Sequence, residues 1–380
     1  MSSCLSLGID IGSETIRLAV AEKNERGPRI KAKASVVSRG ISRGAITDRE
    51  EFGQSLHQGI LAISKSFPQE KIWEATIGFN AGLKTDRESV STIVTHGSGE
   101  VTELDIDRGV AKAAAKIKQV NSKVIQHTIL SYELDGKSID HNPIGMRGKK
   151  LTMEILFVSL PRQTINQLEE ILDSLDVDVV GITSSALVEA PLVLSEVEKT
   201  AGVVALNIGS ELSTAVVYEH GHVIGSRVFE LGSNDITEAL ALALKISLEE
   251  ADTIKIQGSN NKTTAKKRET TINKKYKELF SQTNSLLSEL GRKKLLPAGV
   301  VFTGAGSLYP GIEELAKQEL QLPAKKASVR IVKQELDKRE LPWVAAYGLA
   351  YTGLDAVSDN QFSVKKVFNP IKNLLKNFFI

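Results

Sequence analysis

The sequence predicts a two-lobed α/β protein with a ligand site between the lobes, and three observations predict it. The chain has 380 residues, more than one hydrophobic core usually serves, so at least two domains are expected. A strand–turn–strand pattern occurs twice, half a chain apart, as in a duplicated domain. A third glycine-rich turn lies near residue 304. Because ligand sites often form where such units meet, we expect one between the halves.

The composition is that of an ordinary soluble globular protein. The chain is 41% hydrophobic and 25% charged, with 48 Lys and Arg against 46 Asp and Glu, which argues against disorder and against a dedicated nucleic-acid binder. Its single cysteine, Cys4, excludes a disulfide scaffold and a cysteine-based zinc site, and it suits a reducing compartment. The N-terminus lacks signal-peptide features, and no apolar run approaches the length of about 18 residues needed to span a bilayer. We therefore expect an intracellular protein.

The repeated pattern is a strand, a tight Gly-Ser-Glu turn and a second strand. Residues 10–22 align with residues 207–219, and six of the thirteen positions are identical. Glycine lets the backbone approach a ligand closely, consecutive N–H groups form an anion nest, and the serine hydroxyl adds a donor, so each turn suits a phosphate. The acid before the first turn, Asp10, could hold Mg²⁺ directly or through water. A single copy would more often be an ordinary hairpin, and the repeat reverses that preference.

Residues 92–158 have the pattern of a small α+β unit. A strand is predicted at 92–95 and an alanine-rich helix at 107–119. Two further strands are predicted at 124–134 and 151–158, the second with alternating apolar residues.

The most polar and basic stretch of the chain runs from Gly258 to Lys275. Its turn-forming and charged residues favour a solvated loop. Contact with an acidic partner is the less favoured alternative.

The third glycine-rich turn is Gly304-Ala305-Gly306-Ser307. It follows the apolar run 298–303 and precedes a helix predicted from Pro310 to Leu320. Strand, glycine loop and helix is a general design of nucleotide sites, so the signal is weak by itself. Neither a Walker pattern nor a Rossmann glycine motif is present. Together with the two hairpins, the turn supports a phosphate-binding site.

The last 17 residues have the periodicity of an amphipathic helix with a basic polar face. Asn369 and Pro370 resemble an N-cap and first-turn pair, and no acid follows Asp359. The polar spacer before the tail, its many Phe residues and its Lys and Asn face favour a helix on an anionic membrane surface over a helix packed on its own domain. The residues expected to contact lipid are Val367, Phe368, Ile371, Lys372, Leu374, Leu375, Lys376, Phe378 and Phe379.

The two hairpins and the late glycine turn resemble the phosphate-1, phosphate-2 and adenosine motifs of the superfamily that contains actin, sugar kinases and heat-shock chaperones. Within it, the chain most resembles bacterial cell-division proteins of the FtsA family, over nearly its whole length. The stretches that carry this likeness are Gly8-Ile-Asp-Ile-Gly12, Gly44-Ala-Ile-Thr-Asp48, Asn142-Pro-Ile-Gly-Met146, Leu248-Glu-Glu-Ala-Asp-Thr-Ile-Lys255, Leu296-Pro-Ala-Gly299 and Pro342-Trp-Val-Ala-Ala-Tyr-Gly348.

The resemblance implies a two-lobed actin-like fold, of the duplicated ribonuclease H-like kind, with ATP and Mg²⁺ in the cleft. It also implies an FtsA-type subdomain 1C in place of actin subdomain 1B. The implied parts are subdomain 1A at 1–80 and 161–198, subdomain 1C at 81–160, subdomain 2A with the return to 1A at 199–232 and 296–356, subdomain 2B at 233–295, and a short linker with a C-terminal amphipathic membrane-targeting helix at 357–380.

Residue chemistry and the family pattern together predict four groups of ATP contacts. In the first three, the first turn faces Mg²⁺ and the β- and γ-phosphates, the second turn closes from the other lobe, and the third lies against the sugar and α-phosphate. These residues are Asp10, Gly12, Ser13 and Glu14; Asn207, Gly209, Ser210 and Glu211; and Gly304, Ala305, Gly306 and Ser307. Asp252 and Lys255 match an acid-x-x-Lys pattern that borders the adenosine in relatives, and a solvated helix face is an equally favoured interpretation of that pair.

Two departures from the family pattern bear on catalysis. Relatives usually carry Asp where this chain has Asn207, and many carry an acidic residue followed by Pro where it has Ser185 and Ala186. A neutral amide removes a charge that binds Mg²⁺ or orders water, and no residue that polarises the attacking water is evident. Because phosphoryl transfer depends on positioning and charge neutralisation, we expect slow or absent ATP hydrolysis and assign no catalytic residue.

The resemblance implies a protein that self-assembles into filaments at the membrane and tethers the tubulin-like FtsZ there through its C-terminal helix. The C-terminal peptide of FtsZ would dock on subdomain 2B. The protein would be peripheral, on the cytoplasmic face of the cell membrane at the division site, the septum. Two alternatives stay open: a PilM-like type IV pilus assembly scaffold, against which the basic tail argues, and an ATPase or kinase of the superfamily, against which Asn207 and Ser185 argue.

Overall fold

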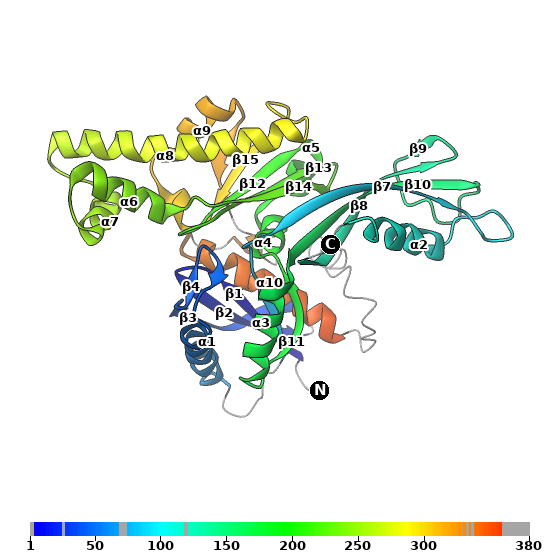
Figure 1. Ribbon diagram of the computed structural model, residues 1–380, viewed down its shortest axis with the longest axis horizontal. Coiled ribbons are helices and arrows are strands. Elements are labelled where there is room, and N and C mark those ends of the chain that lie inside the picture. Colours follow the sequence, from blue (N-terminus) through cyan, green and yellow to red (C-terminus); the bar gives the residue numbers. More distant parts are fainter. Residues whose placement is uncertain are drawn as a thin grey trace.

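The computed structural model shows two α/β lobes (Figure 1). It describes residues 4–24, 27–67, 74–117, 121–328, 330–331, 334–335 and 338–358. The tail at 359–380, for which the sequence predicts a membrane-surface helix, lies outside these residues. Within the described part, no helix is long and apolar enough to cross a bilayer.

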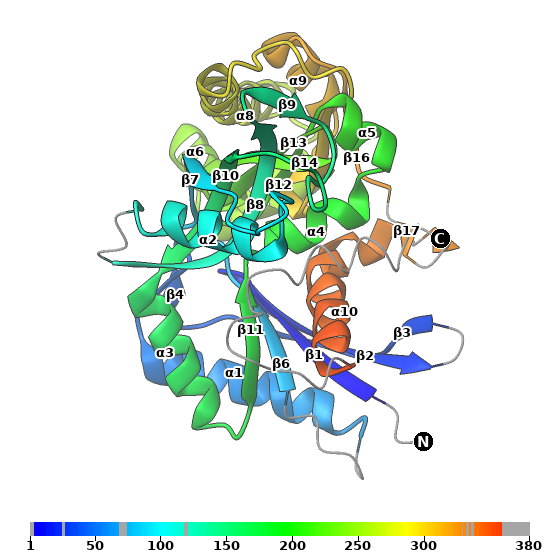
Figure 2. The ribbon, with the colours of Figure 1, turned by 90° about the vertical axis from the view of Figure 1, so that its right-hand side faces the viewer.

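The first lobe is built on a five-stranded sheet in the order β11-β6-β1-β2-β3. Its antiparallel strands are β1 (Cys4–Ile11), β2 (Thr15–Asn24) and β3 (Gly27–Val37). Strand β6 (Glu74–Gly78) runs parallel beside β1, and β11 (Asp178–Thr183) runs parallel beside β6. Helices α1 (Arg49–Ser64) and α3 (Arg162–Asp173) cover one face of the sheet, and α10 (Val344–Ser358) covers the other (Figure 2). The contact with α10 is close, because a Cβ on Gly8 of β1 would lie 2.4 Å from the Ala346 carbonyl oxygen.

The second lobe repeats this topology in the sheet β14-β13-β12-β15-β16. The antiparallel strands are β12 (Val203–Ile208), β13 (Ser213–Glu219) and β14 (His222–Phe229), and β15 (Gly299–Thr303) and β16 (Ala324–Lys326) are the parallel ones. In each lobe the first strand is central and ends in a glycine turn. The duplication predicted from the sequence is therefore confirmed.

The two sheets are joined through α4 (Ser185–Val193), whose nine residues are all buried. This helix packs against β12, β13 and α10. As a result, one hydrophobic cluster runs from Ile9 in β1 to Val203 and Val216 in the second lobe. The helix thus fixes how the two lobes face each other.

A small domain is inserted between β6 and β11 of the first lobe. Its antiparallel sheet has the order β7-β10-β8-β9, with one helix packed against β7 and β10. Its elements are β7 (Lys84–Ile93), α2 (Glu103–Ala114), β8 (Ser122–Leu134), β9 (Lys137–Ile139) and β10 (Lys150–Pro161). The α+β character predicted for this segment is confirmed.

The helix of the inserted domain begins and ends earlier than predicted, at Glu103 and Ala114 rather than at 107 and 119. It begins early because the Asp105 carboxylate accepts a hydrogen bond from the Thr102 N–H at 2.9 Å and another from the Thr102 hydroxyl, which caps the first turn. The predicted bounds ignored this capping pair.

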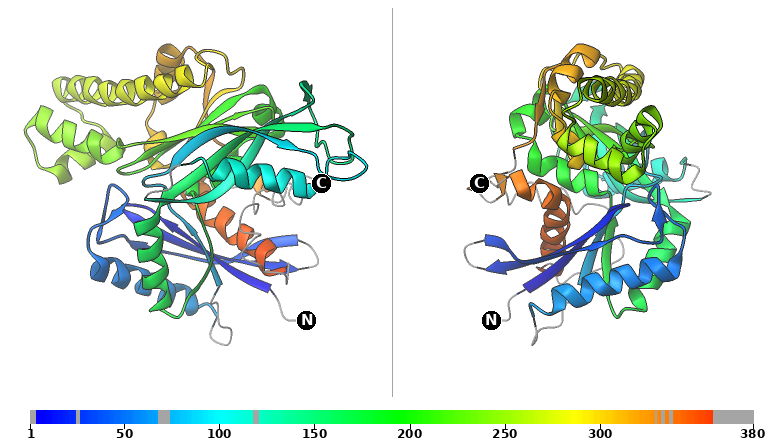
Figure 3. Two further views of the ribbon diagram at one scale, coloured as in Figure 1. Left: turned by 45° about the vertical axis from the view of Figure 1, so that its right-hand side comes forward. Right: turned by 90° about the vertical axis from the view of Figure 1, so that its left-hand side faces the viewer.

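The second lobe carries three further helices, α6 (Ser233–Leu244), α7 (Leu248–Gln257) and α8 (Lys262–Glu289). They project from one end of this lobe, whereas the inserted domain lies at the opposite end (Figures 1 and 3). The interpretation of 258–275 as a solvated loop is wrong from Lys262 onward. Asn261 caps α8 by accepting from the N–H groups of Thr263 and Thr264, and the buried apolar face of the helix begins only at Ile272. The polar first turns therefore concealed the helical period.

The helix after the third glycine turn, α9 (Ile312–Leu320), begins two residues later than predicted. Gly311 takes a left-handed φ of 85° just before it, which keeps Pro310 outside the helix. The remaining elements are β4 (Ile41–Ser42), β5 (Ala45–Ile46), α5 (Glu196–Ala201), β17 (Arg330–Ile331), β18 (Gln334–Glu335) and the 3₁₀ turns Ala305–Leu308 and Lys338–Trp343.

A buried hydrogen bond ties α8 to the third glycine turn, and its loss should weaken the second lobe. The Tyr276 hydroxyl donates to the Gly306 carbonyl oxygen at 2.6 Å. Tyr276→Phe leaves that buried carbonyl without a donor and should lower the free energy of unfolding by about 1 to 2 kcal/mol, measured by urea denaturation. Tyr309→Phe is the control, because the partly exposed Tyr309 hydroxyl makes only a 3.3 Å bond to Asn273. Equal unfolding midpoints for the two variants would contradict this role.

Candidate functional site

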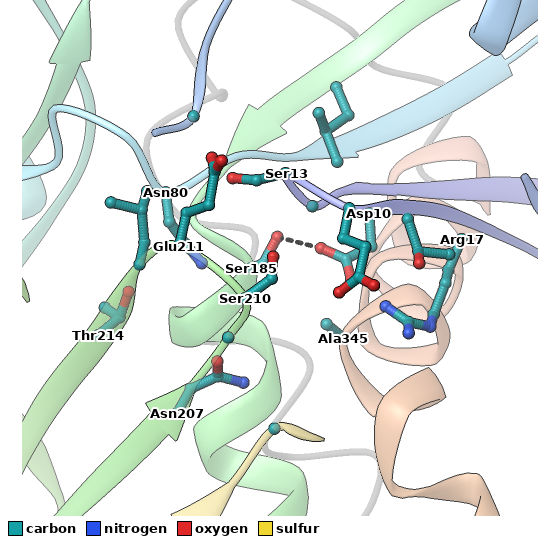
Figure 4. Close-up of a pocket in the computed structure, with 18 of the residues that line it drawn as sticks. Asp10, Ser13, Arg17, Asn80, Ser185, Asn207, Ser210, Glu211, Thr214 and Ala345 are labelled. Atoms are coloured by element: carbon teal, nitrogen blue, oxygen red, sulfur yellow. Dashed lines mark hydrogen bonds between the residues drawn. The ribbon is translucent and has the colours of Figure 1, made fainter. Parts of the chain in front are cut away.

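A pocket lies between the two lobes where the glycine turns meet. Counted with its open mouth and the gaps between its lining atoms, the pocket holds about 900 Å³ of empty space. Polar side chains from both lobes point into it (Figure 4). Ten residues predicted from the sequence line it, namely Asp10, Gly12, Ser13, Glu14, Asn207, Gly209, Ser210, Glu211, Gly304 and Ala305.

The two Gly-Ser-Glu turns have matching geometry. The Gly12 N–H donates to the Thr15 carbonyl oxygen at 3.2 Å, and the Gly209 N–H donates to that of Leu212 at 2.9 Å. A Cβ on Gly12 would lie 2.8 Å from the Thr15 carbonyl oxygen, and a Cβ on Gly209 would lie 2.8 Å from that of Leu212. A side chain at either position would therefore disrupt the turn. Each turn therefore requires glycine at this position and presents the backbone of the next residues to the pocket.

The third turn approaches the second hairpin closely. Gly304 has φ 77°, and a Cβ there would lie 2.4 Å from the Ile208 carbonyl oxygen. Two of its predicted contact residues do not line the pocket. Ser307 donates to the Gly304 carbonyl at 2.7 Å, and Gly306 accepts from Tyr276. These two residues stabilise the turn on the side away from the pocket.

Asp10 stands at the end of β1 on the wall of the pocket. Its carboxylate accepts a hydrogen bond from the Ser185 hydroxyl at 2.6 Å (Figure 4). Burial raises the pKa of the Asp10 carboxyl, and the Ser185 bond and the charge of Arg17 oppose that rise. Ser185 is thus a hydrogen-bond donor to Asp10, not a second acid.

Asn207 occupies the equivalent position at the end of β12, and it contacts an acid that motif reasoning missed. Its Nδ2 donates to the Glu189 carboxylate at 2.6 Å, and Glu189 also accepts from the Thr303 hydroxyl. Only 3% of Glu189 is exposed. Burial raises the pKa of Glu189 to about 7, the two hydrogen bonds lower it, and the charge of Asp10 raises it. A lone acid in the otherwise apolar run 186–194 was the sequence signal.

The start of α4 is held by Asn80, which also lines the pocket. Its side-chain oxygen accepts from the Ser184 hydroxyl at 2.7 Å and from the Ala186 N–H at 3.2 Å. This contact satisfies one of the unpaired N–H groups of the first turn. It also sets the position of the helix that carries Ser185 and Glu189.

Asp252 and Lys255 are not among the residues that line this pocket. Lys255 forms an ion pair with Asp252 at 2.7 Å and donates to the Thr237 hydroxyl at 2.7 Å, which joins α7 to α6. Its ammonium also lies 3.4 Å from the Ser233 carbonyl, and the Ser233 N–H donates to the Gly209 carbonyl at 2.9 Å. The Asp252–Lys255 pair therefore lies behind the second hairpin and is connected to it through Ser233.

A short hairpin from the first lobe crosses to the second at the edge of the pocket. The Arg43 N–H, between β4 and β5, donates to the Glu211 carboxylate at 2.5 Å. The Arg43 guanidinium reaches Asp235 at 3.2 Å and the Glu230 carbonyl at 3.2 Å. Glu211 is thus engaged by the opposite lobe.

A divalent cation in this pocket would need ligands from outside the protein. Among the side chains that the structure describes, no group of three or more His, Cys, Asp or Glu residues is placed to hold a metal. The pocket does offer Asp10 and the two glycine turns. This donor set suits Mg²⁺, which keeps several waters and takes oxygens from bound phosphates.

Comparison with known families identifies two segments of the chain. A family model described as "Cell division protein FtsA" matches residues 204–361, and a model described as "SHS2 domain inserted in FTSA" matches residues 82–159. The chain is 24% identical to the cell division protein FtsA of Bacillus subtilis (strain 168) over 349 residues, which cover 85% of this chain and 78% of that protein. It is 25% identical to the cell division protein FtsA of Pseudomonas aeruginosa over 382 residues, which cover 94% and 91%.

Solved structures share the two-lobed architecture. A chain of the PilM–PilN type IV pilus biogenesis complex matches with a TM-score of 0.66 and 17% identity, over 92% of this chain and 98% of that chain. MreB5 of Spiroplasma citri bound to ADP matches with a TM-score of 0.54 and 13% identity, over 94% and 99%. At these identities the likeness concerns the fold alone. The predicted class, an actin-like fold with an FtsA-type inserted domain, is confirmed.

The buried Glu189 should make stability depend on pH. Its carboxyl has a pKa of about 7 in the folded protein against 4.5 ordinarily, so between these values the folded protein retains a proton that the unfolded chain releases. The stability contributed by this group is full below the lower value and is lost as the pH rises through the upper one. Compared with Glu189→Gln, the wild-type protein should therefore lose stability from about pH 5 to about pH 8, measured by urea denaturation in EDTA. A constant difference between the two proteins would contradict the raised pKa.

Proposed function

Because the chain belongs to the FtsA family of actin-like cell-division proteins, we propose that it binds Mg²⁺ and ATP between its lobes and assembles at the membrane to tether FtsZ filaments. One observation carries the nucleotide part of this proposal. Both Gly-Ser-Glu turns and the third glycine turn line a single pocket, although they lie far apart in the sequence. Three backbone turns that converge on one space suit a polyphosphate.

The residues present fit a magnesium–nucleotide complex. The turns at Gly12 and Gly209 leave no room for a side chain, so their backbones can approach phosphate oxygens. Ser13 and Ser210 add hydroxyl donors, and Asp10 would hold Mg²⁺ through its water shell. The metal would neutralise phosphate charge. That MreB5, a protein of the same fold, was solved with ADP supports a nucleotide ligand here.

Hydrolysis should be slow or absent. Asn207 and Ser185 are neutral, and Ser185 donates its hydroxyl hydrogen to Asp10. The oxygens of Glu189 accept from Asn207 and Thr303, so this carboxylate is not a free general base for an attacking water. Without a group that orients water, the barrier to phosphoryl transfer stays high. We therefore propose that ATP serves mainly to hold the lobes in the state that assembles.

The membrane and partner roles rest on the sequence and on family membership. The basic amphipathic tail would bind anionic lipid on the cytoplasmic face of the membrane at the division site, and self-association would multiply that affinity. The FtsZ C-terminal peptide would dock on subdomain 2B, where Leu242, Leu248 and Ile256 are 81%, 57% and 71% exposed. The subdomain bounds expected from the family likeness stay part of this proposal. The PilM-like alternative shares the fold, and the family models favour the division role.

Gly12→Val should abolish nucleotide binding. Its Cβ would lie 2.8 Å from the Thr15 carbonyl oxygen and would displace the backbone that approaches the phosphates. The affinity for Mg·ATP is measured by isothermal titration calorimetry on the full chain. Gly97→Val is the matched control, because a Cβ at Gly97 meets no atom within 4 Å. Unchanged affinity of the Gly12 variant would remove the first turn from the phosphate site.

Phe378→Glu together with Phe379→Glu should release the protein from lipid. The change puts two charges on the apolar face of the predicted tail helix, where burial in the interface drives binding. Co-sedimentation with anionic vesicles measures the bound fraction. Asn373→Glu with Asn377→Glu adds the same charge on the polar face and should weaken binding less. Equal losses in the two variants, or no loss in the first, would remove the apolar face from the account.

A further inference from the structure

We propose that Glu189 is the second acidic group of the nucleotide cleft and holds the Mg²⁺ of Mg·ATP jointly with Asp10. It would supply from α4 the carboxylate that β12 lacks at Asn207. This inference rests on the proposed nucleotide function and adds a residue outside the three glycine turns.

The two lobes present their acids in a crossed arrangement. Asp10 and Asn207 are equivalent residues of the repeat, each at the end of a central strand. Each is hydrogen-bonded at 2.6 Å to a side chain of α4, Ser185 in the first case and Glu189 in the second. In the first lobe the strand carries the acid and the helix the neutral partner, and in the second lobe the reverse holds. The cleft thus contains one carboxylate from each of these pairs.

Ser185 and Glu189 are four residues apart on α4 and lie on the same face of the helix. Both line the cleft, together with Asp10 and Asn207. A single rigid helix therefore positions one group against each hairpin. Because α4 is wholly buried, Glu189 cannot move away from this position without repacking of the core.

The burial of Glu189 makes its ionised form depend on a positive charge nearby. An ionised carboxylate with 3% exposure in an apolar helix is costly, and this cost is why burial raises the pKa of Glu189 to about 7. A cation that binds in the cleft would offset the cost of ionising this buried carboxyl group, so Glu189 is suited to contact the metal of a bound Mg·ATP.

The charge of the pocket leads to the same conclusion. Among the described residues that line it, Asp10, Glu14, Glu189 and Glu211 are acidic and Arg17 is basic. An uncomplexed polyphosphate would be repelled by this lining. The ligand should therefore enter as a cation–phosphate complex, and its affinity should depend strongly on the divalent cation.

The test measures the factor by which Mg²⁺ strengthens ATP binding, from titration calorimetry of the full chain in EDTA and in saturating Mg²⁺. Glu189→Gln is nearly isosteric and should lower this factor by about 10-fold, the loss typical of removing a group that supports a metal. The double variant Glu189→Gln with Asn207→Asp exchanges the acid and the amide of one hydrogen-bonded pair, so the acid moves from α4 to β12. It keeps the charge of the cleft and should restore most of the factor.

Thr303→Val is the matched control, because it removes the other hydrogen bond to Glu189 without changing charge. It should lower the Mg²⁺ factor less than Glu189→Gln does, because the carboxylate itself remains. If Glu189→Gln leaves the factor unchanged while wild-type protein binds Mg·ATP, Glu189 is structural and this inference fails alone. The inference fails equally if Thr303→Val lowers the factor as much as Glu189→Gln, or if the double variant stays as weak as the single one. Absence of ATP binding by the wild-type protein would overturn the proposed function as well.

Discussion

Two hydrogen bonds connect one buried helix to the central strands that line the cleft. Ser185 donates to Asp10 and Asn207 donates to Glu189, both at 2.6 Å, so α4 touches the end of the central strand in each lobe. The helix is wholly buried between the second sheet and α10. Packing sets the position of α4, and the relative orientation of the two glycine turns depends on that position. A change in the angle between the lobes would have to break or stretch one of these bonds, which couples cleft geometry to lobe orientation.

Much of the fold was predictable because its signals are local. The repeat at Asp10 and Asn207 carries strand, turn and strand in a short window, and both copies form the predicted hairpins. The polar start of α8 was not predictable in the same way. Residues 262–271 show no apolar period, and the helix is fixed by the Asn261 cap and by the buried face from Ile272 onward. Its helical state therefore depends on tertiary contacts that a local pattern does not contain.

The site was predictable where chemistry and turn geometry coincide, and not where packing decides. The three glycine turns converge as expected, because their glycines are needed for close backbone approach. Asp252 and Lys255 form an ion pair behind the second hairpin, a placement set by how α7 packs on α6. Glu189 was missed because motif reasoning looks for acids in loops and at strand ends, whereas this acid lies inside an apolar helix. Its burial and its place as the lone acid of an apolar run together mark it as a functional candidate.

The most direct test of a nucleotide site made by both lobes is hydrogen–deuterium exchange of the full chain with and without Mg·ATP. Binding between the lobes should slow exchange in residues 11–15, 208–212 and 303–306 together. These residues belong to three turns that meet only in the cleft. The inserted domain, 84–161, should exchange equally fast in both conditions. Protection of one hairpin alone, or no protection in either, would contradict a ligand bridged by the two lobes.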